Sequence, residues 1–243
     1  MTRSGRRWLI GGAFAVCLAL AGVIGWMLGI ISAMQGQGQS ALPVLGTAPS
    51  YQGLTNQLGN KVSSEQFRGK VRVVTFLFPY CTTYCPLIAA HLVGFENLLR
   101  SSGLQDRVQI VAFDVDPADT GPEQMRAFLK EYGWNPSNLH WQYLTGKPAT
   151  IKHVVRDGYH IDYRKVSLKQ ESRETGPEQT PQPAVANPLA QKVKPGYDVT
   201  HNDGLIIVDR QGRIRKIYDQ ADTVSIRRLL NTIKPLLKER PNR

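Results

Sequence analysis

The sequence predicts an α/β protein, with one mixed domain behind a single N-terminal transmembrane helix. A long apolar segment without charge lies near the N-terminus, and strongly apolar runs alternate with helical patterns further along. Hydrophobic residues make up 42% of the 243 residues, which excludes a disordered chain. We expect a cytoplasmic tip and anchor at residues 1–34, a tether at 35–49 and one folded domain at 50–243.

The apolar segment covers residues 8–34 and has no charged side chain. As a helix it would be about 40 Å long, enough to span a hydrocarbon core of roughly 30 Å. Arg3, Arg6 and Arg7 precede it and should stay in the cytoplasm. A cleaved signal peptide is the alternative, but its apolar core is usually shorter. The sequence therefore predicts a single-pass protein of the inner (cytoplasmic) membrane, with its C-terminal domain on the periplasmic or extracytoplasmic side.

The formal net charge of +11 suits anionic lipid head groups or an acidic protein partner. No basic stripe or aromatic-rich binding motif accompanies this charge. We therefore expect no nucleic-acid partner.

The first part of the domain combines a buried strand with a helix. Residues 71–78 form an apolar, β-branched and aromatic run, broken only by Arg72 and Thr75. Runs of this kind are typical of strands covered on both faces. Pro79 ends the run, and Pro86 suits the first turn of a helix that extends through residue 99.

The later elements are predicted from apolar periodicity and turn residues. A hairpin turn is expected at residues 209–212, and Pro235 should kink or end the last helix early. The order of elements is that of a thioredoxin-like fold. Residues 167–194 are polar, contain four prolines and show no periodicity, so we expect a mobile surface insertion. The remaining expected elements are strands at 108–113, 140–144, 205–208 and 214–218, and helices at 121–131, 149–156 and 223–238.

Cys81 and Cys85 form the one local dithiol of the sequence, since the third cysteine, Cys17, lies in the predicted membrane helix. A cysteine at a helix N-terminus is stabilised as a thiolate, the form that attacks disulfides and binds soft metals. Residues i and i+4 share one helical face, so both sulfurs could meet in a disulfide or around one metal ion.

Three interpretations of this dithiol remain open. A structural disulfide would close a very small loop and stabilise the fold little. General thiol–disulfide exchange usually uses two intervening residues, whereas three stand here. Metal binding is the third interpretation, because two thiolates suit Cu(I) and an added imidazole extends the site to Cu(II).

A third ligand must come from elsewhere, and the chain has five histidines. His91, His140, His153 and His160 are expected to be structural or solvated. His201 belongs to a polar loop at residues 198–204, directly before the strand at 205–208. In a thioredoxin-like fold the loop before this strand packs beside the dithiol, so His201 is the candidate ligand. The alternative is a loop histidine in solvent.

Taken together, these motifs resemble the Sco/SenC family of copper-binding, thioredoxin-fold assembly proteins for cytochrome c oxidase. The resemblance rests on Val-Val-Thr-Phe-Leu-Phe-Pro-Tyr-Cys, Cys81-x-x-x-Cys85-Pro86, Asp114-Val115-Asp116-Pro117, and His201 ahead of Leu-Ile-Ile-Val-Asp.

The resemblance implies that Cys81, Cys85 and His201 bind one copper ion, as Cu(I) or Cu(II). It also implies a copper chaperone for the oxidase subunit that carries the binuclear copper centre, which could also reduce that centre's cysteines. Asp116 matches an acidic position of the family, where it either supports the site or caps a helix.

Two features depart from the family pattern. Thr82 stands where the family commonly has proline, and the insertion at 167–194 is longer than expected. These departures leave an alternative function open, that of a membrane-anchored thiol–disulfide reductase acting on exported proteins. In that case Cys81 and Cys85 would be a catalytic redox pair.

Overall fold

The computed structural model describes residues 42–137, 140–167, 186–193 and 195–239, together with helical residues 20, 22–27 and 29. The chain divides into two compact units, Met1–Ala41 and Leu42–Arg243. Among the described residues, no helix combines the length and the apolar character that a membrane crossing requires. Most of the predicted anchor at 8–34 lies outside them.

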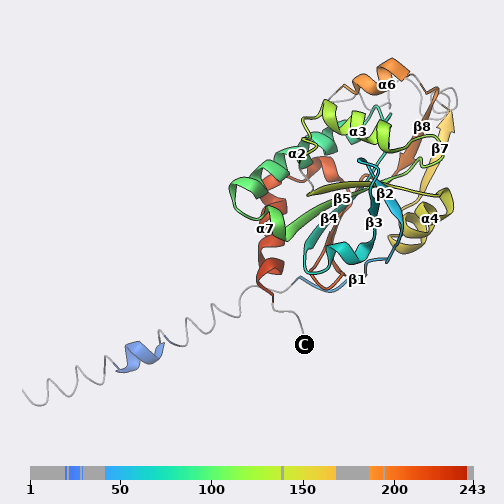
Figure 1. Ribbon diagram of the computed structural model, residues 1–243. Coiled ribbons are helices and arrows are strands. Elements are labelled where there is room, and N and C mark those ends of the chain that lie inside the picture. Colours follow the sequence, from blue (N-terminus) through green and yellow to red (C-terminus); the bar gives the residue numbers. More distant parts are fainter. Residues whose placement is uncertain are drawn as a thin grey trace, which may run out of the picture. The chain divides into compact units, whose positions relative to one another are not determined.

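An eight-stranded sheet runs through the second unit in the order β1-β10-β9-β4-β5-β6-β2-β3 (Figure 1). β4, β5 and β6 are parallel, and the other neighbours are antiparallel. Every residue of β4 and β5 is buried, as the apolar runs predict for strands covered on both faces. The strands are β1 (Gly46–Thr47), β2 (Leu54–Asn56), β3 (Lys61–Val62), β4 (Val71–Leu77), β5 (Val108–Asp114), β6 (Trp141–Thr145), β9 (Leu205–Val208) and β10 (Arg213–Tyr218).

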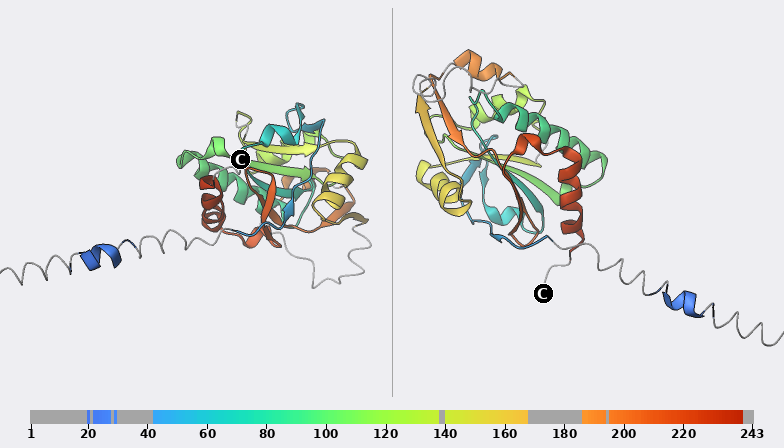
Figure 2. Two further views of the ribbon diagram at one scale, coloured as in Figure 1. Left: turned by 90° about the horizontal axis from the view of Figure 1, so that it is seen from below. Right: turned by 180° about the vertical axis from the view of Figure 1, so that it is seen from behind.

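Helices cover both faces of this sheet (Figures 1 and 2). On one face, the ring of Phe128 lies 6.4 Å from that of Tyr143. On the other, the ring of Tyr159 lies 5.7 Å from that of Phe113. The first face carries α2 (Cys85–Ser101), α3 (Pro122–Glu131) and α7 (Ile226–Lys238), and the second carries α4 (Pro148–Lys152) with the π-helical turn η3 (His153–Gly158). The short 3-10 helices are η1 (Ser64–Phe67), η2 (Gln105–Arg107) and η4 (Ala221–Thr223).

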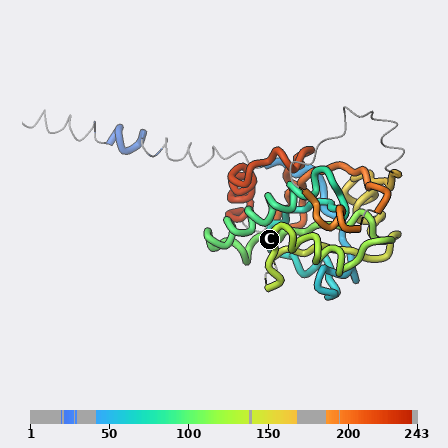
Figure 3. The backbone as a smooth tube through the Cα atoms, turned by 90° about the horizontal axis from the view of Figure 1, so that it is seen from above, coloured from blue at the N-terminus to red at the C-terminus, as the bar shows by residue number. Residues whose placement is uncertain are grey.

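A separate antiparallel ribbon consists of β7 (Tyr163–Ser167) and β8 (Tyr197–His201). The tube in Figure 3 follows the chain through this part of the domain. Asp116, just beyond β5, binds both strands of the ribbon. It accepts a hydrogen bond of 2.7 Å from the Tyr197 hydroxyl and forms an ion pair of 2.9 Å with Lys165. The ribbon is therefore fastened to the carboxyl end of the parallel strands.

The ribbon corrects the sequence prediction for His201, which was placed in a polar loop. His201 is instead the last residue of β8, paired with Tyr163. The pairing partner precedes a polar segment of some thirty residues, so the local sequence gives little sign of it.

Three other boundaries differ from the prediction. The insertion predicted at 167–194 contains a helix, α6 (Pro188–Val193), while residues 168–185 and 194 lie outside the described residues. The second half of the predicted tether is part of the domain, since β1 pairs with β10. α7 continues three residues beyond Pro235, where Leu236 and Leu237 are buried and their packing offsets the missing backbone hydrogen bond.

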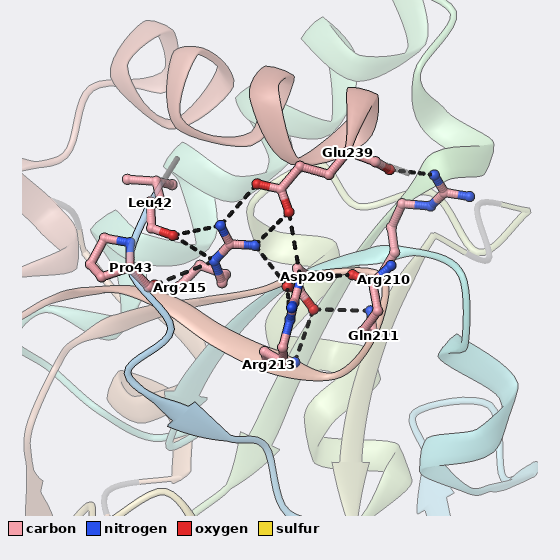
Figure 4. A network of polar contacts seen from close by, with 8 residues as sticks. All are labelled: Leu42, Pro43, Asp209, Arg210, Gln211, Arg213, Arg215 and Glu239. Carbon is pink, nitrogen blue, oxygen red and sulfur yellow. Dashed lines mark hydrogen bonds and ion pairs between the residues drawn. The ribbon is translucent and has the colours of Figure 1, made fainter. Parts of the chain in front are cut away.

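Arg215 of β10 joins the two ends of the domain (Figure 4). Its buried guanidinium forms ion pairs with Asp209 at 2.8 Å and with Glu239 at 2.6 Å. It also donates to the carbonyl of Leu42 at 2.9 Å. Burial would raise the pKa of Asp209, but hydrogen bonds from Arg213 and Arg215 bring that pKa below its usual value. The network fastens the residues after α7 and before β1 to the β9–β10 hairpin.

Candidate dithiol and histidine site

Cys81 lies in the loop that joins β4 to α2, and its side chain is buried. Its backbone N–H donates to the carbonyl of Phe78 at 3.1 Å. Cys85 is the first residue of α2, followed by Pro86. The two cysteines therefore do not share one helical face as predicted, because only Cys85 is helical. Both are free thiols, which differs from the structural disulfide left open above.

The dithiol loop is held by Asn187, a residue that was not among the predicted site residues. Its buried amide donates to the carbonyls of Pro79 at 3.0 Å and Cys81 at 2.6 Å. Its side-chain oxygen accepts hydrogen bonds from the first turn of α6 at 3.1 and 3.2 Å. Asn followed by Pro188 and an apolar pair is a helix-start signal, and it was the available clue in this polar segment.

His201 points its Nε2 atom at the dithiol, 3.6 Å from Sγ of Cys85. Its Nδ1 atom lies 2.9 Å from the carbonyl oxygen of Asn202. A carbonyl oxygen can only accept a hydrogen bond, so Nδ1 carries the hydrogen and donates it. In the neutral ring, Nε2 then has a free lone pair directed toward Cys85. Burial lowers the pKa of His201, which favours this neutral ring near pH 7.

The environment gives the two thiols different acidities. A hydrogen bond with Cys85 has the largest effect on Cys81 and lowers its pKa, against the opposing effect of burial. Burial raises the pKa of Cys85 well above its usual value, and the interaction with Cys81 raises it further. The Thr83 hydroxyl also lies 3.3 Å from Sγ of Cys81. Cys81 is therefore the thiol that ionises first.

Cys81, Cys85 and His201 line one cavity of about 170 Å³. Its wall also contains Asp198 and Asp203, and burial raises the pKa of both carboxyl groups. Within the described ranges, no group of three or more His, Cys, Asp and Glu side chains is already arranged to hold a metal ion. Three-ligand binding at this cavity therefore requires side chains to move from the positions seen.

The other four histidines lie elsewhere, and none of them lines this cavity. His91 is in α2, and His140 lies 3.7 Å from Asp106. His153 lies 3.3 Å from Asp157, and His160 adopts a positive φ of 59°.

The acidic motif at the end of β5 contains two aspartates with different surroundings. Asp116 is not a helix cap, because the N-cap of α3 is Gly121. It supports the site indirectly, by holding the ribbon that ends at His201. Asp114 is fully buried, and burial raises its pKa to about 7. Thr82, the departure from the family pattern, has an exposed side chain in the dithiol loop.

The chain is similar to a known family of proteins. The family model described as SCO1/SenC matches residues 47–180, which is more than half of the chain and includes both cysteines of the cavity. The SCO1 protein homolog of Bacillus subtilis (strain 168) is 35% identical over 91 residues. These residues make up 37% of this chain and 45% of the relative, so the match spans less than half of that relative's length.

Solved structures are similar over most of the domain. Bradyrhizobium japonicum ScoI with copper bound has a TM-score of 0.58 and 20% sequence identity, over 79% of this chain and 99% of that chain. BsSco, a member of the Sco family of cytochrome c oxidase assembly proteins with a disulfide switch, has a TM-score of 0.60 and 21% identity. That similarity covers 83% of this chain and 100% of the other. At these identities the likeness shows the fold, which is thioredoxin-like and mixed α/β.

Proposed function

This chain belongs to the SCO1/SenC family, and from that premise we propose that it binds copper and delivers it to cytochrome c oxidase. Cys81, Cys85 and His201 are the proposed ligands, and the binuclear copper centre of the oxidase is the proposed acceptor. The observation that carries the proposal is the lone pair of His201 Nε2, directed at Cys85 Sγ from 3.6 Å beside a second thiol.

The donor set suits copper in both oxidation states. Thiolates are soft ligands that select Cu(I), and an imidazole nitrogen stabilises Cu(II). Binding two thiolates releases protons, and the lowered pKa of Cys81 makes its thiolate the more available of the two. Copper is the cargo, and we propose that thiolates on the acceptor displace Cys81 and Cys85 in turn. The copper-bound structure of a Bradyrhizobium japonicum protein with this fold supports the proposal.

The direct test is anaerobic copper titration of the purified chain with reduced thiols. We expect about one copper per chain, and loss of tight binding in Cys81→Ser and Cys85→Ser. His201→Ala should weaken Cu(II) binding more than Cu(I) binding, because imidazole matters most to the oxidised ion. His153→Ala is the matched control, since His153 is exposed on η3. Failure of the reduced wild-type chain to take up copper would refute the proposal.

The unequal acidity of the two thiols favours a second candidate, reduction of disulfides in exported proteins. The Cys81 thiolate would attack one sulfur of a partner disulfide and release the other sulfur as a thiolate. Cys85, after losing its proton, would then attack the mixed disulfide. The chain ends with a Cys81–Cys85 disulfide and the partner with two thiols. Metal-free chain should then reduce a disulfide substrate stoichiometrically, and Cys81→Ser should not.

We also propose that residues 8–34 anchor the chain in the cytoplasmic membrane and that the domain lies on the periplasmic or extracytoplasmic side. Support comes from the uncharged apolar segment and the three arginines that precede it. Alkaline extraction of membranes should leave the full chain in the pellet, and protease added to spheroplasts should digest the domain. Release by alkali, or protection from protease, would contradict this placement.

A further inference from the structure

A larger cavity, of about 410 Å³, lies at the other end of β4 from the dithiol. We call it the Arg72 cavity. Its wall is formed by residues 47–50, by part of η1, by Arg72 of β4 and by the turn at residues 210–212. Arg72 is near the start of β4, whereas the dithiol loop follows its end. Five strand residues between these points correspond to roughly 17 Å, so the two cavities are separate.

Among the described residues, the buried cation of Arg72 has no hydrogen-bond or ion-pair partner. Its side chain is 7% exposed, and its Nε atom is buried without a hydrogen bond. In the part of the chain that the structure describes, no hydrogen bond or ion pair engages its guanidinium. Burial of an unpaired charge is destabilising, and proteins normally supply a counter-charge. An anion in the cavity would supply it.

The neighbours of Arg72 add positive charge and free donors. Arg210 donates to the carbonyls of Gly69 at 3.1 Å and Glu239 at 3.3 Å, and it forms no ion pair with any described residue. Arg68 forms an ion pair with Glu65. With three arginines and one glutamate, the cavity wall carries two positive charges more than negative.

Two small residues shape the wall around these charges. The Ser64 hydroxyl accepts a hydrogen bond from Tyr51 N at 3.2 Å, so its own hydrogen is free to donate. Gly212 has a φ of +86°, and a Cβ at this position would lie 3.3 Å from Nη2 of Arg72. Because no side chain stands there, the guanidinium remains accessible from the cavity.

We propose that the Arg72 cavity binds a phosphate group, either as inorganic phosphate or as the phosphomonoester head group of a lipid. A guanidinium presents a planar fork of donors that matches two phosphate oxygens. The excess of two positive charges matches a dianion better than a monocarboxylate. Phosphate binding at this cavity does not require copper. A failure of this proposal would therefore leave the proposed copper function untouched, and the reverse also holds.

The test is calorimetric titration of the full chain with inorganic phosphate, against a chloride control of equal ionic strength. We expect saturable binding of one phosphate per chain. Arg72→Met should weaken it at least tenfold, because the substitution removes the charge-assisted hydrogen bonds from the guanidinium to the phosphate oxygens. Arg72→Met should also melt at a higher temperature than wild type in phosphate-free buffer, because it removes an unpaired buried charge.

Arg227→Met is the matched control, since Arg227 is exposed on α7 and its loss changes the net charge equally. It should bind phosphate as wild type does. If Arg72→Met does not fold, Arg210→Met takes its place and should also weaken binding. Absence of phosphate binding above the chloride control, or equal affinity in wild type and both cavity variants, would overturn the proposal.

A second titration distinguishes the two sources of the phosphate group. Short-chain dihexanoyl phosphatidic acid, which is a soluble phosphomonoester lipid, is compared with inorganic phosphate. Tighter binding of the lipid identifies a head-group site, whereas equal or weaker binding identifies a site for free phosphate. In both cases binding should depend on Arg72. If Arg72→Met binds phosphate or the lipid as tightly as wild type does, the cavity is not the binding site.

Discussion

Protonation of the Asp114 carboxyl group should affect the stability of the turn after β5, which contains Asp116 and so supports the candidate site. It is fully buried at the end of β5, and its carboxyl group lies 2.8 Å from the Thr120 hydroxyl and 2.9 Å from the Thr145 hydroxyl. The Thr120 hydroxyl also lies 2.7 Å from the carbonyl of Asp116, which can only accept. When the Thr120 hydroxyl donates its single hydrogen to the carbonyl of Asp116, the hydroxyl oxygen of Thr120 can accept a hydrogen bond from the carboxyl group of Asp114. A protonated Asp114 satisfies this arrangement.

Replacing Asp114 by asparagine should therefore change how stability depends on pH. Burial raises the pKa of this carboxyl group from 3.8 to about 7 in the folded chain. Between these values the unfolded chain binds fewer protons than the folded chain, so wild-type stability falls as pH rises. The free energy of unfolding falls by at most about 1.4 kcal/mol per pH unit, and the loss levels off above pH 7. The total loss between pH 5 and pH 8 is therefore about 3 kcal/mol. Asparagine does not titrate and escapes this loss.

The assay is urea unfolding of the reduced full chain, wild type and Asp114→Asn, at pH 5 and pH 8. The difference in the free energy of unfolding should shift by about 3 kcal/mol in favour of the variant at the higher pH. Other titrating groups, among them Asp209, contribute equally to both proteins and cancel. A difference that stays constant between the two pH values would refute a neutral, buried Asp114.

Three further substitutions test polar contacts of the domain by urea unfolding. Asn187→Ala leaves two buried carbonyls without donors and should lower the free energy of unfolding by about 2 kcal/mol; no loss would contradict its role. Arg215→Met breaks a buried ion network and should cost about 3–5 kcal/mol, whereas the exposed control Arg68→Ala should cost under about 1 kcal/mol. Equal losses would refute that ranking. Tyr197→Phe removes a bond to Asp116 and should cost about 1.5–3 kcal/mol, and an unchanged midpoint would count against this link.

The centre of the fold could be predicted because its signals are local. The apolar runs that became β4 and β5 contain the β-branched and aromatic residues of strands covered on both faces. Pro86 and the apolar spacing after it correctly predicted α2. The ribbon was not predictable in this way, because β7 and β8 pair across a long polar segment and each is only five residues long.

The site was predicted in part for similar reasons. Cys81 and Cys85 were identified by spacing, and His201 by its place before a strand. The tautomer of His201 depends on a backbone carbonyl whose direction no sequence pattern specifies. Arg72 was visible only as a break in an apolar run, and only the tertiary structure shows that its Nε atom has no hydrogen-bond partner among the described residues.

The register of the ribbon has a consequence for how this protein can vary in length. Ser167 and Tyr197 lie opposite each other, so the chain leaves the ribbon and returns to it at the same place. The entropic cost of closing a loop between two paired strand ends grows only with the logarithm of the loop length. Changes in the number of residues that connect β7 to α6 should therefore leave His201 opposite Tyr163.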